Sequence, residues 1–204
     1  MKRTFAILMA LMMLFSVSAY AESTEATDAA TAPEASALPQ ITFDETAAPY
    51  QGSWVTFNDA GFEVYLPSDW VQKEVTDEMQ AAGTLYAGTS ADGAYAMTLS
   101  YAESGNVTTN DDLAAQLAAA GYQNVTALNI NGIDVVGYDI DAQDVSGMAF
   151  LDSNGGMYVF SFTPASNETF KTIGQTIISS LSPVAEATDG TEETAETDDT
   201  AAAE

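Results

Sequence analysis

Hydrophobic and polar positions alternate along much of residues 52–183, and this alternation predicts a series of β-strands. In the segment 62–66, Phe62, Val64 and Leu66 fall on one face of an extended chain. In the segment 94–103, large residues alternate with small ones, so one face is apolar and the other is small enough for a helix to pack closely. The same criterion predicts strands at 53–57, 62–66, 84–89, 94–103, 122–130, 133–142, 147–151 and 157–163.

Turn residues join these strands in consecutive pairs. Asn131-Gly132 lies between two hydrophobic stretches and is a strong signal for a tight hairpin. The stretches 58–61, 91–93 and 152–156, rich in Gly, Asp and Asn, predict three further hairpins. Consecutive hairpins indicate a sheet that is antiparallel.

Three stretches have helical periodicity instead. Residues 76–82 carry acidic residues in the first turn, and 111–120 follow a capping-box spacing at 109–112. The last helix is expected to begin at Ser166 as its N-cap, with an apolar stripe that includes Phe170, Ile173 and Ile177. Strand pairs with helices between them predict an α+β fold, an antiparallel β-sheet flanked by helices.

Composition divides the chain into four parts. Residues 1–21 have a basic start, an apolar run and a small-residue end, which predict a secretory signal peptide cleaved after Ala21. Residues 22–51 form an Ala, Thr and Glu-rich linker and 184–204 an acidic tail, and both compositions predict disorder. Residues 52–183 form one domain. We therefore expect a secreted, extracytoplasmic product without stable membrane insertion after cleavage.

The charge limits the partners. The chain has 30 Asp or Glu residues and 4 Lys or Arg residues, and two of the four basic residues lie in the signal peptide. Cleavage leaves Lys73 and Lys171 against 30 acids, a net charge of −28. Such a charge repels nucleic acid and anionic lipid, so neither is expected to be a partner.

The chain also has no Cys and no His. This composition excludes disulfides, thiolate nucleophiles, Ser-His-Asp triads and imidazole or thiolate metal sites. Carboxylate, hydroxyl and amide chemistry remains. Paired carboxylates can hydrolyse glycosides, but sixteen acidic residues in 52–183 make chance pairs common. We identify no catalytic residue, no cofactor-binding residue and no enzyme activity.

One acidic run is a candidate metal site. Asp139, Asp141 and Asp144, preceded by Asp134, offer oxygen ligands for calcium or magnesium. The EF-hand pattern fails, because Asp144 stands where a glycine is needed. The alternative is a solvated strand face that leads into a loop.

Aromatic residues offer a second candidate surface. Trp54, Tyr65, Trp70, Tyr95 and Tyr101 could line a carbohydrate or peptide groove or pack in the core, and core packing is favoured for Trp70.

The order of these signals resembles the PsbP-like family. The resemblance lies in Phe62-x-Val64-x-Leu66-Pro67-x-x-Trp70, in Asn131-Gly132-Ile133 with Tyr138, in Tyr158-x-Phe160-x-Phe162, and in Ser179-Ser180-Leu181. It covers residues 52–183 and implies the Mog/PsbP-like fold, a sheet between helical layers, which also occurs in bacterial secreted domains of unknown function.

The resemblance also implies a function. Family members are non-enzymatic assembly or accessory subunits, some of them associated with manganese, calcium or chloride. We therefore expect an exported, non-catalytic accessory or binding module whose partner is a protein or a component of the cell envelope. A weak divalent-cation-binding protein and a carboxylate-based polysaccharide hydrolase remain as alternatives.

Overall fold

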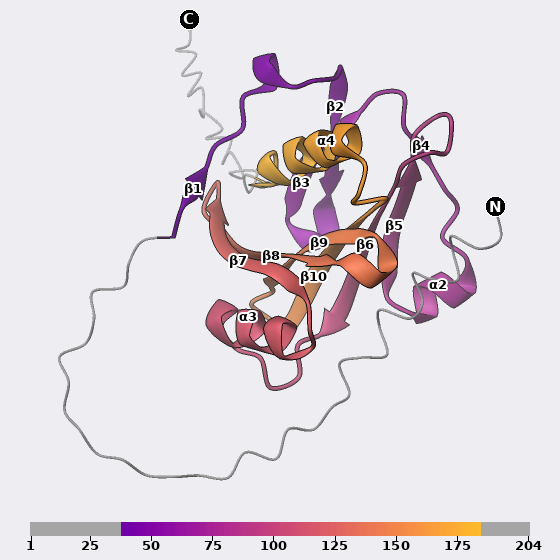
Figure 1. The fold of residues 1–204 in the computed structure, drawn as a ribbon. Helices are drawn as coiled ribbons and strands as arrows, with labels where there is room; N and C mark the ends of the chain where they lie inside the picture. The colour runs from indigo at the N-terminus through magenta and orange to yellow at the C-terminus, as the bar shows by residue number, and fades with distance from the viewer. Residues whose placement is uncertain (1–37, 185–204) are drawn as a thin grey trace, which may run out of the picture.

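The computed structural model describes residues 38–184 (Figure 1). The signal peptide at 1–21, its cleavage after Ala21, residues 22–37 of the linker and residues 185–204 of the tail lie outside the described residues. The elements follow in the order β1 (Gln40–Ile41), η2 (Glu45–Ala47), β2 (Gly52–Phe57), η3 (Asn58–Ala60), β3 (Phe62–Pro67), β4 (Val71–Gln72), α2 (Asp77–Ala81), β5 (Thr84–Thr89), β6 (Ala96–Glu103), α3 (Asn110–Ala119), β7 (Gln123–Ile130), β8 (Ile133–Ile140), η4 (Asp141–Gln143), β9 (Val145–Leu151), β10 (Gly156–Thr163), α4 (Glu168–Ser179) and β11 (Ser182–Pro183).

The strands form two sheets. The larger has eight strands in the order β1-β7-β8-β9-β10-β6-β5-β4, and the smaller has three in the order β11-β3-β2. All pairs are antiparallel except β1 with β7. The expected α+β class, with a largely antiparallel sheet flanked by helices, is confirmed. The β2–β3 hairpin forms a separate sheet, which the strand pattern did not predict.

Other elements pack against both faces of the larger sheet (Figure 1). One face packs against α4 and the smaller sheet, with Phe62, Phe160 and Ile177 among its fully buried side chains. The other packs against α3, where Leu113 and Leu117 are fully buried. The predicted four-residue spacing of these two leucines therefore marks the helix face that meets the sheet.

The predicted turns have the backbone geometry that their residues favour. Asn131 and Gly132 have φ angles of 48° and 91°, the left-handed values that a type I′ hairpin turn needs. This turn fixes the register of β7 with β8, in which Leu128 lies opposite Val135. The hydrophobic faces of the two strands therefore coincide.

The start of the last helix differs from the expectation. The N-cap of α4 is Asn167, whose side chain accepts a hydrogen bond from Phe170 N at 3.0 Å. Ser166 instead donates both its N–H and its hydroxyl to Asp144, at 2.6 and 3.0 Å. Both residues suit an N-cap position, so the sequence does not distinguish them.

Residues 38–51, which we expected to belong to the disordered linker, make ordered contacts in the structure. β1 pairs in parallel with the end of β7, with Gln40 opposite Asn129. Phe43 then packs 5.6 Å from the ring of Trp54 and 5.4 Å from that of Tyr65. Tyr50 stacks on Tyr65 and donates its hydroxyl to the Tyr65 carbonyl at 2.9 Å. This N-terminal arm, residues 40–51, joins the edge of the larger sheet to the outer face of the smaller one.

Candidate functional site

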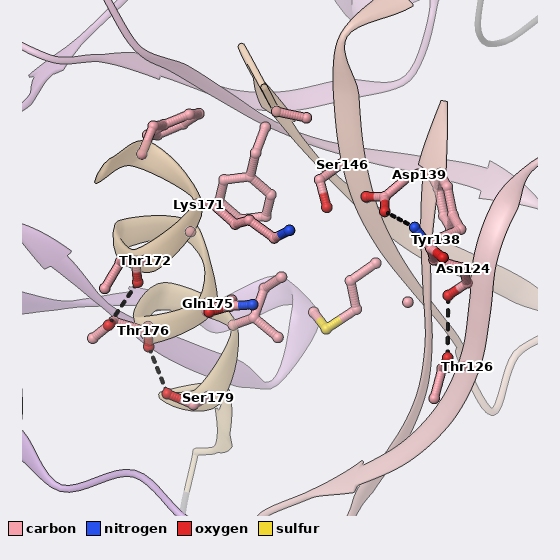
Figure 2. Close-up of a pocket in the computed structure, with 18 of the residues that line it drawn as sticks. Asn124, Thr126, Tyr138, Asp139, Ser146, Lys171, Thr172, Gln175, Thr176 and Ser179 are labelled. Atoms are coloured by element: carbon pink, nitrogen blue, oxygen red, sulfur yellow. Dashed lines mark hydrogen bonds between the residues drawn. The ribbon is translucent and has the colours of Figure 1, made fainter. Parts of the chain in front are cut away.

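A groove lies between α4 and the strands β7, β8 and β9, with a cavity volume of about 990 Å³ (Figure 2). Helix α4 packs over β3 and the middle of the larger sheet, so it leaves the β7–β9 end of the sheet uncovered on this face. Ile41 and Thr42 of the N-terminal arm line the groove as well.

Glycine makes the floor of the groove deep. Thr126, Gly137 and Met148 lie side by side on β7, β8 and β9. A Cβ atom built on Gly137 would meet nothing closer than the carbonyl oxygens of Thr126 and Gly147, at 3.9 and 4.0 Å. The middle of the floor is therefore backbone with no side chain above it, and a larger residue at 137 would project into the cavity.

The floor is apolar toward one end. Leu128 on β7 and Val135 on β8 are opposite each other in the register and both line the groove. Ile41 from the N-terminal arm and Ile178 from α4 line it too. A ligand side chain at this end would meet mainly aliphatic groups.

Helix α4 forms one wall. Lys171, Gln175 and Ile178 are spaced by four and three residues, so they share one face of the helix. Phe170 and Ile177, about 100° around the helix from Lys171 and Ile178, are buried in the core. Figure 2 shows Lys171 and Gln175 projecting from α4 toward Ser146 and Asp139 across the groove.

The other wall is polar. Asn124 donates its side-chain amide to Asp139 Oδ2 at 2.7 Å, and Thr126 donates its hydroxyl to the carbonyl of Asn124 at 3.1 Å (Figure 2). Asn124 has a φ angle of 52° at an irregularity in the β7–β8 register. This left-handed residue directs a polar side chain toward the next strand, as β-bulges commonly do.

The three aspartates proposed as metal ligands all line the same end of the groove. Asp139 lies near the end of β8 and accepts the hydrogen bond from Asn124, and Asp141 begins η4. Asp144 follows η4 with a φ of 56°, and its carboxylate accepts both hydrogen bonds from Ser166. Within residues 38–184, no three acidic side chains form a group placed to hold a metal ion. Cation binding stays a prediction.

Most of the aromatic candidates pack rather than line a groove. Tyr95 stacks on Phe170 with 4.6 Å between ring centroids, and Trp70 lies 6.1 Å from the same ring. Core packing of Trp70 is thus confirmed. Tyr65 is 5% exposed beneath the N-terminal arm, whereas Trp54 is 40% exposed.

Tyr101 is part of a polar contact at the end of β6. Its hydroxyl donates to Asp152 Oδ2 at 3.2 Å. Desolvation, followed by the hydrogen bond to Asp152, raises the pKa of Tyr101 above its usual value. These contacts leave no continuous row of exposed aromatic rings formed by the five candidates.

The sequence pattern did not indicate Gly137 or Gln175 as site residues, and Lys171 stood out only as one of two lysines. The single glycine in the middle of the strand 133–142 was the available signal, because an interior strand glycine often marks an open or closely approached backbone. The groove itself draws on residues between 41 and 179, so no local pattern contains it.

Among the described residues, no helix has both the length and the apolarity needed to cross a membrane.

No protein-family model matches the sequence, and no curated protein matches it. The fold is similar to the solution structure of cyanobacterial PsbP (CyanoP) from Synechocystis sp. PCC 6803, with 15% identity and a TM-score of 0.47, over 67% of this chain and 95% of that one. It is also similar to a crystal structure from Bacteroides thetaiotaomicron VPI-5482, with 17% identity and a TM-score of 0.44, over 67% of this chain and 50% of that one. The chain thus spans about half of the Bacteroides protein. The name of the cyanobacterial structure is that of the family that the motif order resembles. At these identities the similarity concerns the fold alone.

Proposed function

We propose that this chain is an exported, non-catalytic accessory module, and that the groove between α4 and β7–β9 is the surface with which it binds its partner. The groove carries the proposal: its volume of about 990 Å³ is in the range of ligand sites, and an apolar floor lies between polar walls. Such sites gain affinity from the floor and specificity from the walls.

The side chains in the groove suit binding more than chemistry. Asn124, Thr126, Ser146 and Gln175 offer neutral hydrogen-bond donors and acceptors, and Lys171 offers an ammonium group. The chain has no His, the side chain that most often acts as a general base, and no Cys, whose thiolate is a nucleophile near neutral pH.

Export is supported by the sequence of residues 1–21, with cleavage after Ala21 as the proposed processing step. The large excess of acidic residues supports a partner that is neither nucleic acid nor an anionic membrane.

Substitution at Gly137 tests the groove. The φ angle of Gly137 is not in the left-handed region, so a side chain there adds no backbone strain. Gly137→Phe should fill the floor, whereas Gly137→Ala should leave the cavity open. The full chain and both variants are immobilised and exposed to extracellular and envelope fractions of the producing organism.

We expect the wild-type chain and Gly137→Ala to capture the same component and Gly137→Phe to lose it by about tenfold or more. Thermal unfolding of each variant checks that the fold is intact. Equal capture by all three proteins would show that the groove is not the binding surface.

A further inference from the structure

We infer that the occupant of the groove is an extended polypeptide segment with apolar residues at one end and basic residues at the other. This inference rests on the proposed function, since it names the class of partner that the same groove would take. Its basis is the length of the groove, the gradient of polarity along it, and the charge of its lining.

The length suits a short stretch of extended chain. The groove follows α4, whose 12 residues span about 18 Å at about 1.5 Å per residue. An extended chain rises about 3.3 Å per residue, so about five residues fill this length. The neutral amide and hydroxyl groups of Asn124, Gln175 and Ser146 along the walls match the hydrogen-bonding groups of a peptide backbone.

The two ends of the groove differ in polarity. β8 runs from Val135 at the apolar end to Asp139 at the other, while α4 runs in the opposite sense from Glu168 to Ile178. Both β8 and α4 therefore place their aliphatic residues at the end beside the N-terminal arm and their carboxylates at the end beside η4. A bound segment would need the same order, with apolar residues near Ile178 and charged residues near Asp139.

The sign of the charge selects a basic segment. The residues that line the groove include the four carboxylates of Asp139, Asp141, Asp144 and Glu168, against the single ammonium group of Lys171. The domain around them, residues 52–183, has sixteen acidic residues and two lysines. Lysine or arginine side chains of a partner gain from this field, and acidic side chains are repelled by it.

Three synthetic peptides with a neutral dye test the inference by fluorescence anisotropy with the full chain. The basic peptide is Leu-Val-Gln-Ser-Lys-Lys, its charge-reversed form is Leu-Val-Gln-Ser-Glu-Glu, and a polar control is Ser-Ser-Gln-Ser-Lys-Lys. We expect the basic peptide to bind at least about tenfold more tightly than either of the others.

Paired variants locate the binding. Asp139→Asn with Asp141→Asn should weaken binding of the basic peptide by about five- to tenfold. Glu78→Gln with Glu103→Gln removes the same charge from exposed positions outside the groove lining and should change the affinity by less than about twofold. Gly137→Phe should abolish binding.

The contrary outcomes separate the two proposals. If the charge-reversed or polar peptide binds as well as the basic one and Gly137→Phe abolishes it, the groove is a binding site and the basic segment is wrong. If the basic peptide binds all variants equally, charge elsewhere on the chain holds it, and the groove assignment fails as well. Absence of peptide binding by the wild-type chain would also overturn the inference.

Discussion

The ring of Tyr138 on β8 lies over the backbone of Gly147, its direct partner on β9. A Cβ atom at position 147 would lie 2.5 Å from Cε2 of the ring and 2.7 Å from the hydroxyl oxygen. Tyr138 is buried beneath α3 with Val136 and Leu117, so the ring has little room to move. The same arrangement recurs where Tyr101 faces Gly156 and Tyr65 faces Gly52. These glycines are needed for the space that an aromatic ring occupies, not for a turn.

We therefore expect Gly147→Ala to destabilise the domain by about 1–3 kcal/mol, because the methyl group must displace a packed ring. Gly137→Ala on the neighbouring strand is the matched control and should change the stability by well under that amount, since its methyl group has space. Urea unfolding followed by tryptophan fluorescence measures both. If the ring is the cause, Gly147→Ala should cost less in a Tyr138→Leu background; an unchanged cost would contradict this explanation.

Asp144 and Ser166, which line one end of the groove, are joined by two hydrogen bonds. Asp144→Ala removes both of them and also places alanine at a φ of 56°, so we expect a loss of about 1–3 kcal/mol. Asp144→Gly relieves the backbone strain and should recover part of the loss. Asp141→Ala, at an exposed neighbouring position, is the control and should be nearly neutral. Chemical denaturation ranks the three, and equal stability of Asp144→Ala and Asp141→Ala would be the contrary result.

The N-terminal arm contributes to stability. Phe43→Ala removes the ring that contacts Trp54 and Tyr65, and we expect a loss of about 1–2 kcal/mol. Because Trp54 is in this contact, its fluorescence should also change, which a Trp70→Phe background isolates. Thr42→Ala, at an exposed position in the same arm, should alter neither quantity. A chain that begins at residue 52 and keeps full stability would show that the arm is dispensable.

The stability of the domain should fall at alkaline pH. Burial raises the pKa of Tyr138 above its ordinary value of 10.0, and the nearby Tyr122 adds to the effect. Burial likewise raises the pKa of Tyr50. The folded chain thus holds these protons more tightly than the unfolded chain, so their contribution is complete below pH 10 and is lost as the pH rises above it.

Tyr138 alone should contribute a decrease of up to about 1.4 kcal/mol per pH unit in that window. Urea midpoints across the alkaline range, together with the ultraviolet absorbance of tyrosinate, measure it. Tyr138→Phe keeps the ring and should make the curve less steep. Full tyrosinate absorbance near pH 10 in the folded protein would contradict the expectation.

Binding of calcium at Asp139, Asp141 and Asp144 would disturb hydrogen bonds that these side chains already make. A cation would compete with Asn124 for Asp139 and with Ser166 for Asp144. We therefore expect calcium or magnesium to bind no more tightly than about millimolar, the weak end of protein sites. Isothermal calorimetry of the full chain checks this expectation. Ser166→Ala removes the hydroxyl donor to Asp144 Oδ2 but keeps the backbone donor to Oδ1, so it should strengthen any binding only modestly. Micromolar binding by the wild-type chain would contradict it.

The sequence predicted the hairpins well, because a turn such as Asn131-Gly132 and the alternation in Phe62–Leu66 are decided by neighbouring residues. It did not predict β1, β4 or β11, each two residues long and too short to show a period. Nor did it show that β2 and β3 form a separate sheet, since long-range packing decides which strands pair with each other.

For the site, the sequence pointed to the acidic end of the groove but not to the groove. Asp139, Asp141 and Asp144 are conspicuous because they are close together in the chain and charged. The floor at Gly137 and the wall at Gln175 belong to elements that meet only in the folded domain. The cavity forms where α4 leaves part of the larger sheet uncovered. Which part α4 covers is decided by packing across the whole domain.

The parallel pairing of Gln40 with Asn129 also constrains the order in which the domain can form. When the chain leaves a ribosome or an export channel from its N-terminus, β1 emerges long before the β7–β8 hairpin that it joins. Closing so long a loop gains little until the hairpin is complete. Of the strands described, the first to emerge must therefore wait for this hairpin before it docks, and until then the edge of β7 stays open to other chains or chaperones.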